Sequence, residues 1–248
     1  MESIVVKDLH KTYNGAVEPS VAGLDFSFPE GRIAGLLGPN GAGKTTTISI
    51  ICGIVKASAG TVTVCQLPQD AMHREKIKQM IGIVPQQIAL FPGLTAFENL
   101  IYFGNLYGLK GASLRRKVNH YLEIFGLEHA ANKEVSKFSG GMKRRTNIIA
   151  AILHDPKLLI LDEPTAGVDV QSRNMILQFL KEYNASGNSI LYTSHLLEEA
   201  QALCDEVVIM DQGKLIAQGD PHELVEIHGE CRNLEDVFLH YTGHAVRD

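Results

Sequence analysis

Residues 38–45 read Gly-Pro-Asn-Gly-Ala-Gly-Lys-Thr, which matches the pattern G-x-x-x-x-G-K-[ST]. A glycine-rich turn lets several backbone N–H groups point at one anion, because glycine has no Cβ to clash. The helix expected from Lys44 would direct the positive end of its dipole at that anion. In such loops the lysine binds the terminal phosphates and the next hydroxyl binds Mg²⁺. The predicted nucleotide-binding residues are Gly38, Pro39, Asn40, Gly41, Ala42, Gly43, Lys44, Thr45 and Thr46.

Two adjacent acids, Asp162 and Glu163, follow the apolar run Leu158–Leu161. Such a run predicts a buried strand, and α/β proteins bind ligands beyond the carboxyl ends of their strands. An aspartate in this position holds Mg²⁺, often through water, and a glutamate beside it can act as general base toward an attacking water molecule. Without the phosphate loop, solvated acids at a strand end would be the simpler explanation. With that loop, the two acids predict a hydrolytic nucleotide site.

Residues 138–143 read Phe-Ser-Gly-Gly-Met-Lys. They resemble the L-S-G-G-Q signature of the ATP-binding-cassette (ABC) family, with Phe138 in place of leucine and Met142 in place of glutamine. Methionine in this position is familiar in the branch of the family that exports drugs and polymers, which often reads S-G-G-M-K-R-R, as this chain does. The resemblance implies that ATP binds with Mg²⁺. It also implies that a γ-phosphate is received at a helix N-terminus by Ser139, Gly140 and Gly141.

The resemblance also implies roles for other residues. Tyr13 lies where the family places an aromatic ring that stacks on adenine, although an exposed tyrosine at a strand end is the plain alternative. Gln86 resembles the Q-loop glutamine that meets Mg²⁺ and senses the transporter, and Gln87 is the alternative register. Asp169 belongs to a segment that resembles the D-loop, which contacts the opposite protomer. His195 resembles the switch histidine that hydrogen-bonds the γ-phosphate, whereas a lone histidine is otherwise usually structural or solvated.

The predicted site therefore has catalytic and metal-binding members. The catalytic residues are Lys44, Gln86, Glu163 and His195. The Mg²⁺ ligands are Thr45, Gln86 and Asp162. The resemblance spans residues 2–220 and implies that the signature of one subunit closes over the phosphate loop of another. Because Lys44 and Ser139 fall in different subdomains, we expect a head-to-tail dimer around two MgATP, formed by two identical chains or by this chain and another ABC ATPase subunit.

The order of the predicted elements indicates an α/β fold: a P-loop NTPase-like, mostly parallel sheet core with an antiparallel β subdomain and a helical insertion. Apolar residues recur with helical spacing between 96 and 153, which predicts a helical subdomain over about 87–155. Residues 1–220 are expected to form one ABC ATP-binding domain, and residues 221–248 a short helical extension. We predict strands over 4–6, 24–28, 32–37, 61–64, 81–84, 158–161, 189–193, 207–210 and 215–218, and helices from 44, over 171–183 and over 196–203.

The composition bounds the class of protein. Of 248 residues, 45% are hydrophobic and 21% charged, which is the balance of a globular chain rather than a disordered one. The net charge of -5 argues against a nucleic-acid partner. No apolar run reaches the roughly 18 residues that cross a membrane, no secretory signal is evident, and the four cysteines form no C-x-x-C pair. We expect a cytoplasmic protein, held at the inner face of the cell membrane by a separate transmembrane permease.

Four classes of function share some of these features. The export ATPase subunit, for a drug-like or other small or lipidic substrate, fits best, because the tail Leu234–Phe238 also resembles the ending of the export branch. An importer subunit lacks that support. A soluble ABC ATPase that acts on ribosomes or DNA would usually carry two cassettes or long coiled coils, and a P-loop kinase would have no use for the signature. The basic run Lys143–Arg145 is predicted to be a solvated or interface face, and the pair His240 and His244 a surface feature.

Overall fold

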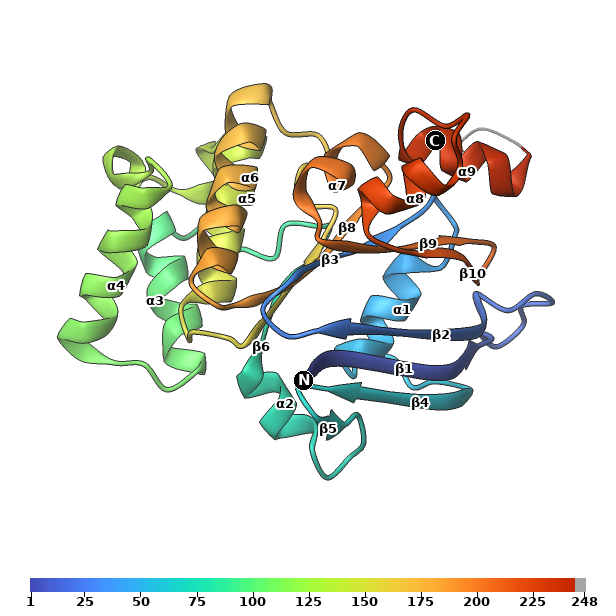
Figure 1. Ribbon diagram of the computed structural model, residues 1–248. Helices are drawn as coiled ribbons and strands as arrows, with labels where there is room; N and C mark the ends of the chain where they lie inside the picture. Colours follow the sequence, from blue (N-terminus) through green and yellow to red (C-terminus); the bar gives the residue numbers. More distant parts are fainter. Residues whose placement is uncertain (244–248) are drawn as a thin grey trace.

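A six-stranded sheet forms the centre of the computed structural model, which describes residues 1–243 (Figure 1). The strand order is β10-β9-β3-β8-β7-β6, and neighbouring strands are parallel except for the edge pair β9 and β10. The mostly parallel core predicted from the sequence is confirmed. The strands are β3 (Ile33–Leu37), β6 (Ile81–Val84), β7 (Leu158–Asp162), β8 (Ser189–Ser194), β9 (Glu206–Asp211) and β10 (Lys214–Gly219).

A second, antiparallel sheet has the order β2-β1-β4-β5. Its strands are β1 (Glu2–Lys11), β2 (Val21–Pro29), β4 (Ala59–Val64) and β5 (Leu67–Pro68). β1 is longer than the predicted strand 4–6. The pairing register with β2 shifts between Val6 and Leu9, and Asp8 there has a φ of 46°. This irregularity returns Leu9 to the buried face after two exposed polar residues. The alternation of apolar and polar residues is interrupted there, so the sequence pattern predicted only the first part of the strand.

Helices cover the central sheet and build the insertion. α3, α4 and α5 occupy the stretch predicted to be helical, and α3 and α4 lie on the far side of the molecule from the antiparallel sheet (Figure 1). α2 has no counterpart among the predicted elements. Of the two histidines predicted to be a surface feature, His240 lies in the last helix and His244 lies outside the described residues. None of the helices in residues 1–243 is long and apolar enough to cross a membrane. The helices are α1 (Lys44–Ile51), α2 (Arg74–Met80), α3 (Ala96–Leu106), α4 (Gly111–Ile124), α5 (Gly140–Ile152), α6 (Val170–Ala185), α7 (Leu197–Leu203), α8 (Pro221–Ile227) and α9 (Leu234–Thr242), with short 3-10 turns at Glu128–Ala130 and Val135–Lys137.

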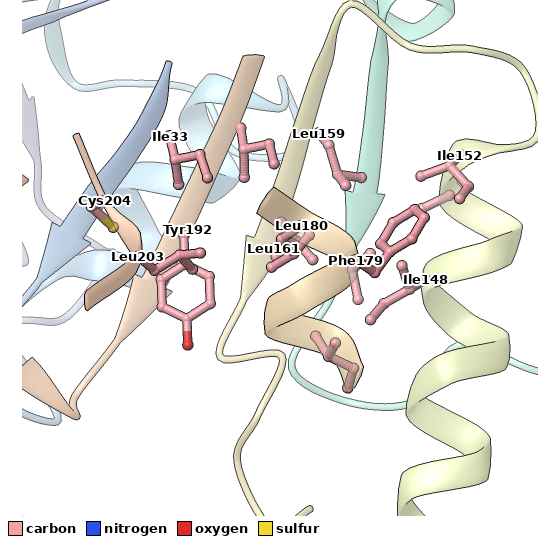
Figure 2. Packing of buried hydrophobic residues seen from close by; sticks show 14 of the residues in the cluster. Ile33, Ile148, Ile152, Leu159, Leu161, Phe179, Leu180, Tyr192, Leu203 and Cys204 are labelled. Carbon is pink, nitrogen blue, oxygen red and sulfur yellow. The ribbon is translucent and has the colours of Figure 1, made fainter. Parts of the chain in front are cut away.

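Successive residues of the central strands enter two different hydrophobic clusters, one on each face of the sheet. Leu159, Leu161 and Tyr192 belong to the cluster that α5, α6 and α7 complete (Figure 2). The intervening residues Leu158 and Ile160 belong to the cluster shared with α1 and the antiparallel sheet. Because both faces are covered, these strands are apolar throughout, which is why short apolar runs marked them in the sequence.

The loops that follow the parallel central strands all lie at one edge of the sheet. β3, β8 and β7 are parallel neighbours, and in their register Leu37 pairs with Ser194 and Asp162 pairs with Thr193. β6 lies on the other side of β7 and runs in the same direction. The four segments that follow these strands therefore start side by side, at the edge where α/β proteins bind ligands.

The contact between β6 and α5 gives a stability prediction. A Cβ on Gly82 would lie 2.2 Å from the carbonyl oxygen of Ala151 and 2.9 Å from Pro156 Cγ, so Gly82→Ala would force the two elements apart. We expect the free energy of unfolding in urea to fall by about 1–3 kcal/mol. Gly93→Ala is the matched control, because no atom lies within 4 Å of its added Cβ, and it should change stability by less than about 0.5 kcal/mol. Equal stability of both variants would contradict this packing.

Candidate functional site

The phosphate loop joins β3 to α1, and two of its glycines stand where no side chain fits. A Cβ on Gly38 would lie 2.1 Å from the carbonyl oxygen of Met210, and one on Gly43 would lie 2.4 Å from that of Ser20. Both glycines also have positive φ angles, 148° and 103°. The loop can therefore run against neighbouring backbone and turn its N–H groups toward a ligand. α1 begins directly after it, at Lys44.

Lys44 is buried, with 5% of its surface exposed. Its ammonium group donates to the carbonyl oxygens of Gly38 at 2.7 Å and of Pro39 at 3.1 Å, and Glu163 Oε1 lies 3.6 Å away. Burial lowers the pKa of Lys44, and the negative charges of Glu163 and Asp162 oppose that shift. Two backbone oxygens thus hold the ammonium group within the loop, where it can bind an entering phosphate.

Asp162 and Glu163 are also buried, at 5% and 7% exposure. Thr45 donates its hydroxyl to Asp162 Oδ2 at 3.2 Å, and Thr193 donates to Asp162 Oδ1 at 2.8 Å. The Thr193 hydroxyl in turn accepts the backbone N–H of Glu163 at 3.0 Å. Carboxylate and hydroxyl oxygens suit Mg²⁺, which proteins often bind with one or two carboxylates plus substrate phosphates. Thr45 and Asp162 therefore fit a Mg²⁺ ion beside the phosphate loop.

The carboxylate of Glu163 is the point where the predicted catalytic residues meet. Gln86 donates its amide to Oε2 at 3.1 Å, and His195 Nδ1 lies 3.3 Å from the same oxygen. Gln86, rather than Gln87, is the glutamine that reaches this carboxylate. The backbone of Glu163 has a φ of 49°, a conformation that non-glycine residues rarely adopt. Such residues persist where the surrounding structure holds them, and they cluster at active sites.

Part of the loop lines a cavity of about 230 Å³ together with Gln86 and Glu163, whereas Asp162 and His195 lie outside its lining. It can hold a polyphosphate in the loop, a cation beside Asp162 and a water molecule at Glu163. Tyr13 is outside the lining: it is 42% exposed after β1, and Lys11 Nζ lies 4.9 Å from its ring centroid. The lining residues are Ser20, Asn40, Gly41, Gly43, Lys44, Thr45, Thr46, Gln86 and Glu163.

The signature lies apart from this cavity. Ser139 is exposed and caps α5, accepting a backbone N–H of the first turn at 3.2 Å, and Gly140 and Gly141 open the helix. A Cβ on Gly141 would lie 2.2 Å from Ser172 Oγ of α6, so glycine is required for this contact. Asp169 caps α6 through the N–H of Ser172 at 2.9 Å. None of these residues lines the cavity of their own chain within residues 1–243.

Two residues near the site had no predicted role. Thr193 positions both acids, and its place opposite Asp162 depends on the β7–β8 register, which the sequence does not determine. The run Lys143–Arg145 was predicted to be a solvated or interface face, and for Arg144 that prediction is wrong, because its side chain is buried inside the chain. It is 5% exposed and donates to the carbonyl oxygens of Pro85 at 2.8 Å and of Gln86 at 2.6 Å. The signal was available, because consecutive residues of a helix point in different directions.

A family model described as ABC transporter matches residues 21–166. The chain belongs to the ABC transporter family. It is 50% identical over 204 residues to the linearmycin resistance ATP-binding protein LnrL of Bacillus subtilis. The matched region covers 82% of this chain and 65% of that protein. It is 44% identical over 232 residues to the Nod factor export ATP-binding protein I of Ralstonia nicotianae, with 93% and 71% covered. These relatives confirm the resemblance to the export branch, although the chain spans only about two thirds of their length.

The solved structures show the same fold. A dimeric ATP-binding cassette in a post-hydrolysis state, bound to ADP and Pi, has a TM-score of 0.80 and 26% sequence identity to this chain, with 88% of this chain and 98% of that one covered. The predicted ABC ATPase fold is confirmed. This ABC chain therefore carries the ATPase domain of its family, and the geometry of Lys44, Asp162 and Glu163 can be interpreted in those terms.

The role of Thr193 is testable by removing its hydroxyl. Thr193→Val keeps the shape of the side chain but leaves the Glu163 N–H and Asp162 Oδ1 without this partner. We expect the free energy of unfolding to fall by about 1–3 kcal/mol in urea titrations. Thr193→Ser keeps the hydroxyl and should lose less. If the valine variant is as stable as the wild type, the hydroxyl does not hold the two acids.

Proposed function

We propose that this chain binds ATP with Mg²⁺ and hydrolyses it as one subunit of an exporter, whose drug-like or other small or lipidic substrate passes through a separate permease. The observation that carries this proposal is the meeting of Lys44, Gln86 and Glu163 in one cavity, with Ser139 on another surface. The names of the relatives, which specify linearmycin resistance and Nod factor export, support the direction and class of transport.

In the proposed reaction, the loop N–H groups and Lys44 bind the phosphates and offset their charge. Thr45 and Asp162 would hold Mg²⁺, which neutralises charge on the phosphate oxygens. Glu163 accepts a proton from a water molecule while the oxygen of that water bonds to the γ-phosphorus. The bond from the γ-phosphorus to the bridging oxygen breaks, and that oxygen leaves with ADP. The products are ADP, phosphate and one proton.

Three other residues would support this step. Gln86 already donates to the Glu163 carboxylate and can orient it toward the water molecule. His195 lies beside the same carboxylate and can turn a ring N–H toward the γ-phosphate. Tyr13 presents a half-exposed ring after β1, on which adenine would stack.

The proposed catalytic unit is a head-to-tail dimer. A single chain does not bring its signature to its own cavity, so Ser139, Gly140 and Gly141 of a second subunit would close over the phosphates. The second subunit is an identical chain or another ABC ATPase subunit. The dimeric cassette bound to ADP and Pi supports this arrangement, since the folds match. ATP binding would close the dimer, and hydrolysis would reopen it.

The permease would dock on the loop that follows Gln86. Phe91 and Tyr102 are 45% and 43% exposed, with ring centroids 4.9 Å apart. Leu106, on the same helix as Tyr102, is 61% exposed. Asn99 holds the loop rigid here, accepting the N–H of Phe91 at 2.8 Å and donating to its carbonyl oxygen at 3.0 Å. Exposed apolar groups on a fixed loop fit a protein partner. Through that partner, the chain would lie at the inner face of the cell membrane.

A pull-down tests the transporter assignment. Tagged full-length chain is recovered in detergent from native membranes, and the retained proteins are identified by mass spectrometry. We expect a stoichiometric polytopic membrane protein. Phe91→Glu with Leu94→Glu should abolish its recovery, whereas Met72→Glu, at a residue 86% exposed elsewhere, should not. Ribosomal or chromatin proteins without a membrane partner would indicate a soluble ATP-driven clamp instead.

Replacing the proposed base tests the chemistry. Glu163→Gln should reduce ATP turnover by about 10²- to 10⁴-fold while ATP still binds. Because ATP then persists, the variant should form dimers with MgATP in light-scattering measurements. Glu198→Gln makes the same change at an exposed acid and should turn over like the wild type. If Glu163→Gln stays monomeric with MgATP at high concentration, with or without the permease, the dimer model is wrong.

A further inference from the structure

The guanidinium group of Arg144 binds the carbonyl oxygens of two successive peptide units in the Q-loop, the segment 85–89 that follows β6. One terminal nitrogen donates to the carbonyl oxygen of Pro85 at 2.8 Å, and the other donates to that of Gln86 at 2.6 Å. The planar, forked guanidinium suits two acceptors at once, whereas a lysine ammonium is a single point of charge. The arginine is buried, so these carbonyl oxygens replace the water that its charge has lost.

The same face of α5 continues this contact. Asn147, one turn after Arg144, accepts the N–H of Ala89 at its Oδ1 at 3.3 Å. In the turn that follows α5, His154 Nε2 lies 3.0 Å from the carbonyl oxygen of Ile81, at the start of β6. Arg144 and Asn147, three positions apart, share one face of the helix. This face of α5 and the turn after it are therefore bonded to points along the segment from Ile81 to Ala89.

This contact joins two parts of the proposed site. At its N-terminus, α5 carries the signature residue Ser139. One turn later, Arg144 holds the backbone of Gln86, whose side chain donates to Glu163 Oε2 at 3.1 Å. Burial lowers the pKa of Arg144, and the negative charges of Asp162 and Glu163 oppose that shift, so the guanidinium lies within the field of the catalytic acids.

We propose that Arg144 is a positioning residue for hydrolysis, which ties the signature helix to the Q-loop backbone and so sets the place of the Gln86 amide at Glu163. This inference rests on the site proposed above. When a phosphate held by the partner subunit engages Ser139, α5 and Gln86 move as one body. Arg144 thereby makes hydrolysis in the chain's own cavity faster when the neighbouring cavity is occupied, without making it impossible when that cavity is empty.

A tryptophan reporter can follow the Q-loop directly, because the chain contains no tryptophan. Gln87→Trp places one on an exposed residue between the two points held by Arg144 and Asn147. Emission is titrated with a non-hydrolysable ATP analogue and Mg²⁺, analogue affinity is measured by calorimetry, and turnover is measured by phosphate release. With Arg144 intact, the analogue should shift the emission to a saturating value.

Arg144→Met in this background should bind the analogue with a dissociation constant within about threefold of the parent, lose the emission shift, and lose about 10- to 100-fold in kcat. Arg144→Lys should fall between the two. Arg145→Met is the matched control, because its guanidinium donates to the carbonyl oxygen of Phe125 at 2.6 Å instead of to the Q-loop. It should keep both the shift and the turnover.

The outcomes separate the two proposals. An Arg144→Met variant that keeps the shift and kcat overturns the positioning role, and so does one whose analogue affinity falls in step with kcat. If that variant does not fold, Arg144→Lys decides, and unchanged kcat in it overturns the role. A parent that binds the analogue without any emission shift shows that the Q-loop does not respond to nucleotide. That result would also contradict the proposed role of Gln86 in orienting the Glu163 carboxylate.

Discussion

Three buried charges, on Lys44, Asp162 and Glu163, share the carboxyl edge of one parallel sheet, and the surrounding structure keeps each of them paired. A buried charge without a partner costs several kcal/mol, so every nearby element must supply a donor, an acceptor or an opposite charge. The phosphate loop supplies carbonyl oxygens to the lysine, Thr193 on β8 donates to the carboxylate of Asp162, and Gln86 donates to that of Glu163. The register of β3, β8 and β7 brings these partners together, and Glu163 follows β7 in a left-handed backbone conformation. A bound polyphosphate would enter a site whose charges are already placed.

A single chain brings the phosphate loop and the acids together, but it does not bring its own signature to them. The phosphate loop and the acids lie on the central sheet, whereas the signature lies at the exposed end of α5. The buried face of this helix binds the segment after β6, through Arg144 at Pro85 and Gln86 and through Asn147 at Ala89. In the proposed dimer, a partner that contacts the signature would act through α5 and Arg144 on the backbone of Gln86, whose side chain bonds Glu163. The same loop carries the exposed Phe91 further along, so the residue that bonds the Glu163 carboxylate and the proposed permease surface are joined by one short stretch of chain.

Sequence reasoning placed the site where its signals were local and failed where they depended on tertiary contacts. The phosphate loop and the acids after β7 were predictable, since glycine spacing and a buried apolar run are visible within a few residues. Gln86 was favoured over Gln87 by resemblance alone, because only the fold decides which of two adjacent side chains reaches the acid, and the structure places Gln86 there. Thr193 was missed because strand register is a property of the sheet. Arg144 was misjudged because charge alone suggests solvent, while backbone carbonyl oxygens from another element can satisfy a buried guanidinium.

The most direct test of this account mixes two inactive variants. Lys44→Ala disables the phosphate loop, and Ser139→Arg blocks the signature, so each variant alone should hydrolyse almost no ATP. In a head-to-tail dimer of one copy of each, one site keeps both an intact loop and an intact signature. The mixture should therefore regain activity, up to about a quarter of the wild-type rate where subunits pair at random. A mixture as inactive as its components would show that loop and signature do not meet between subunits, and would contradict the central claim.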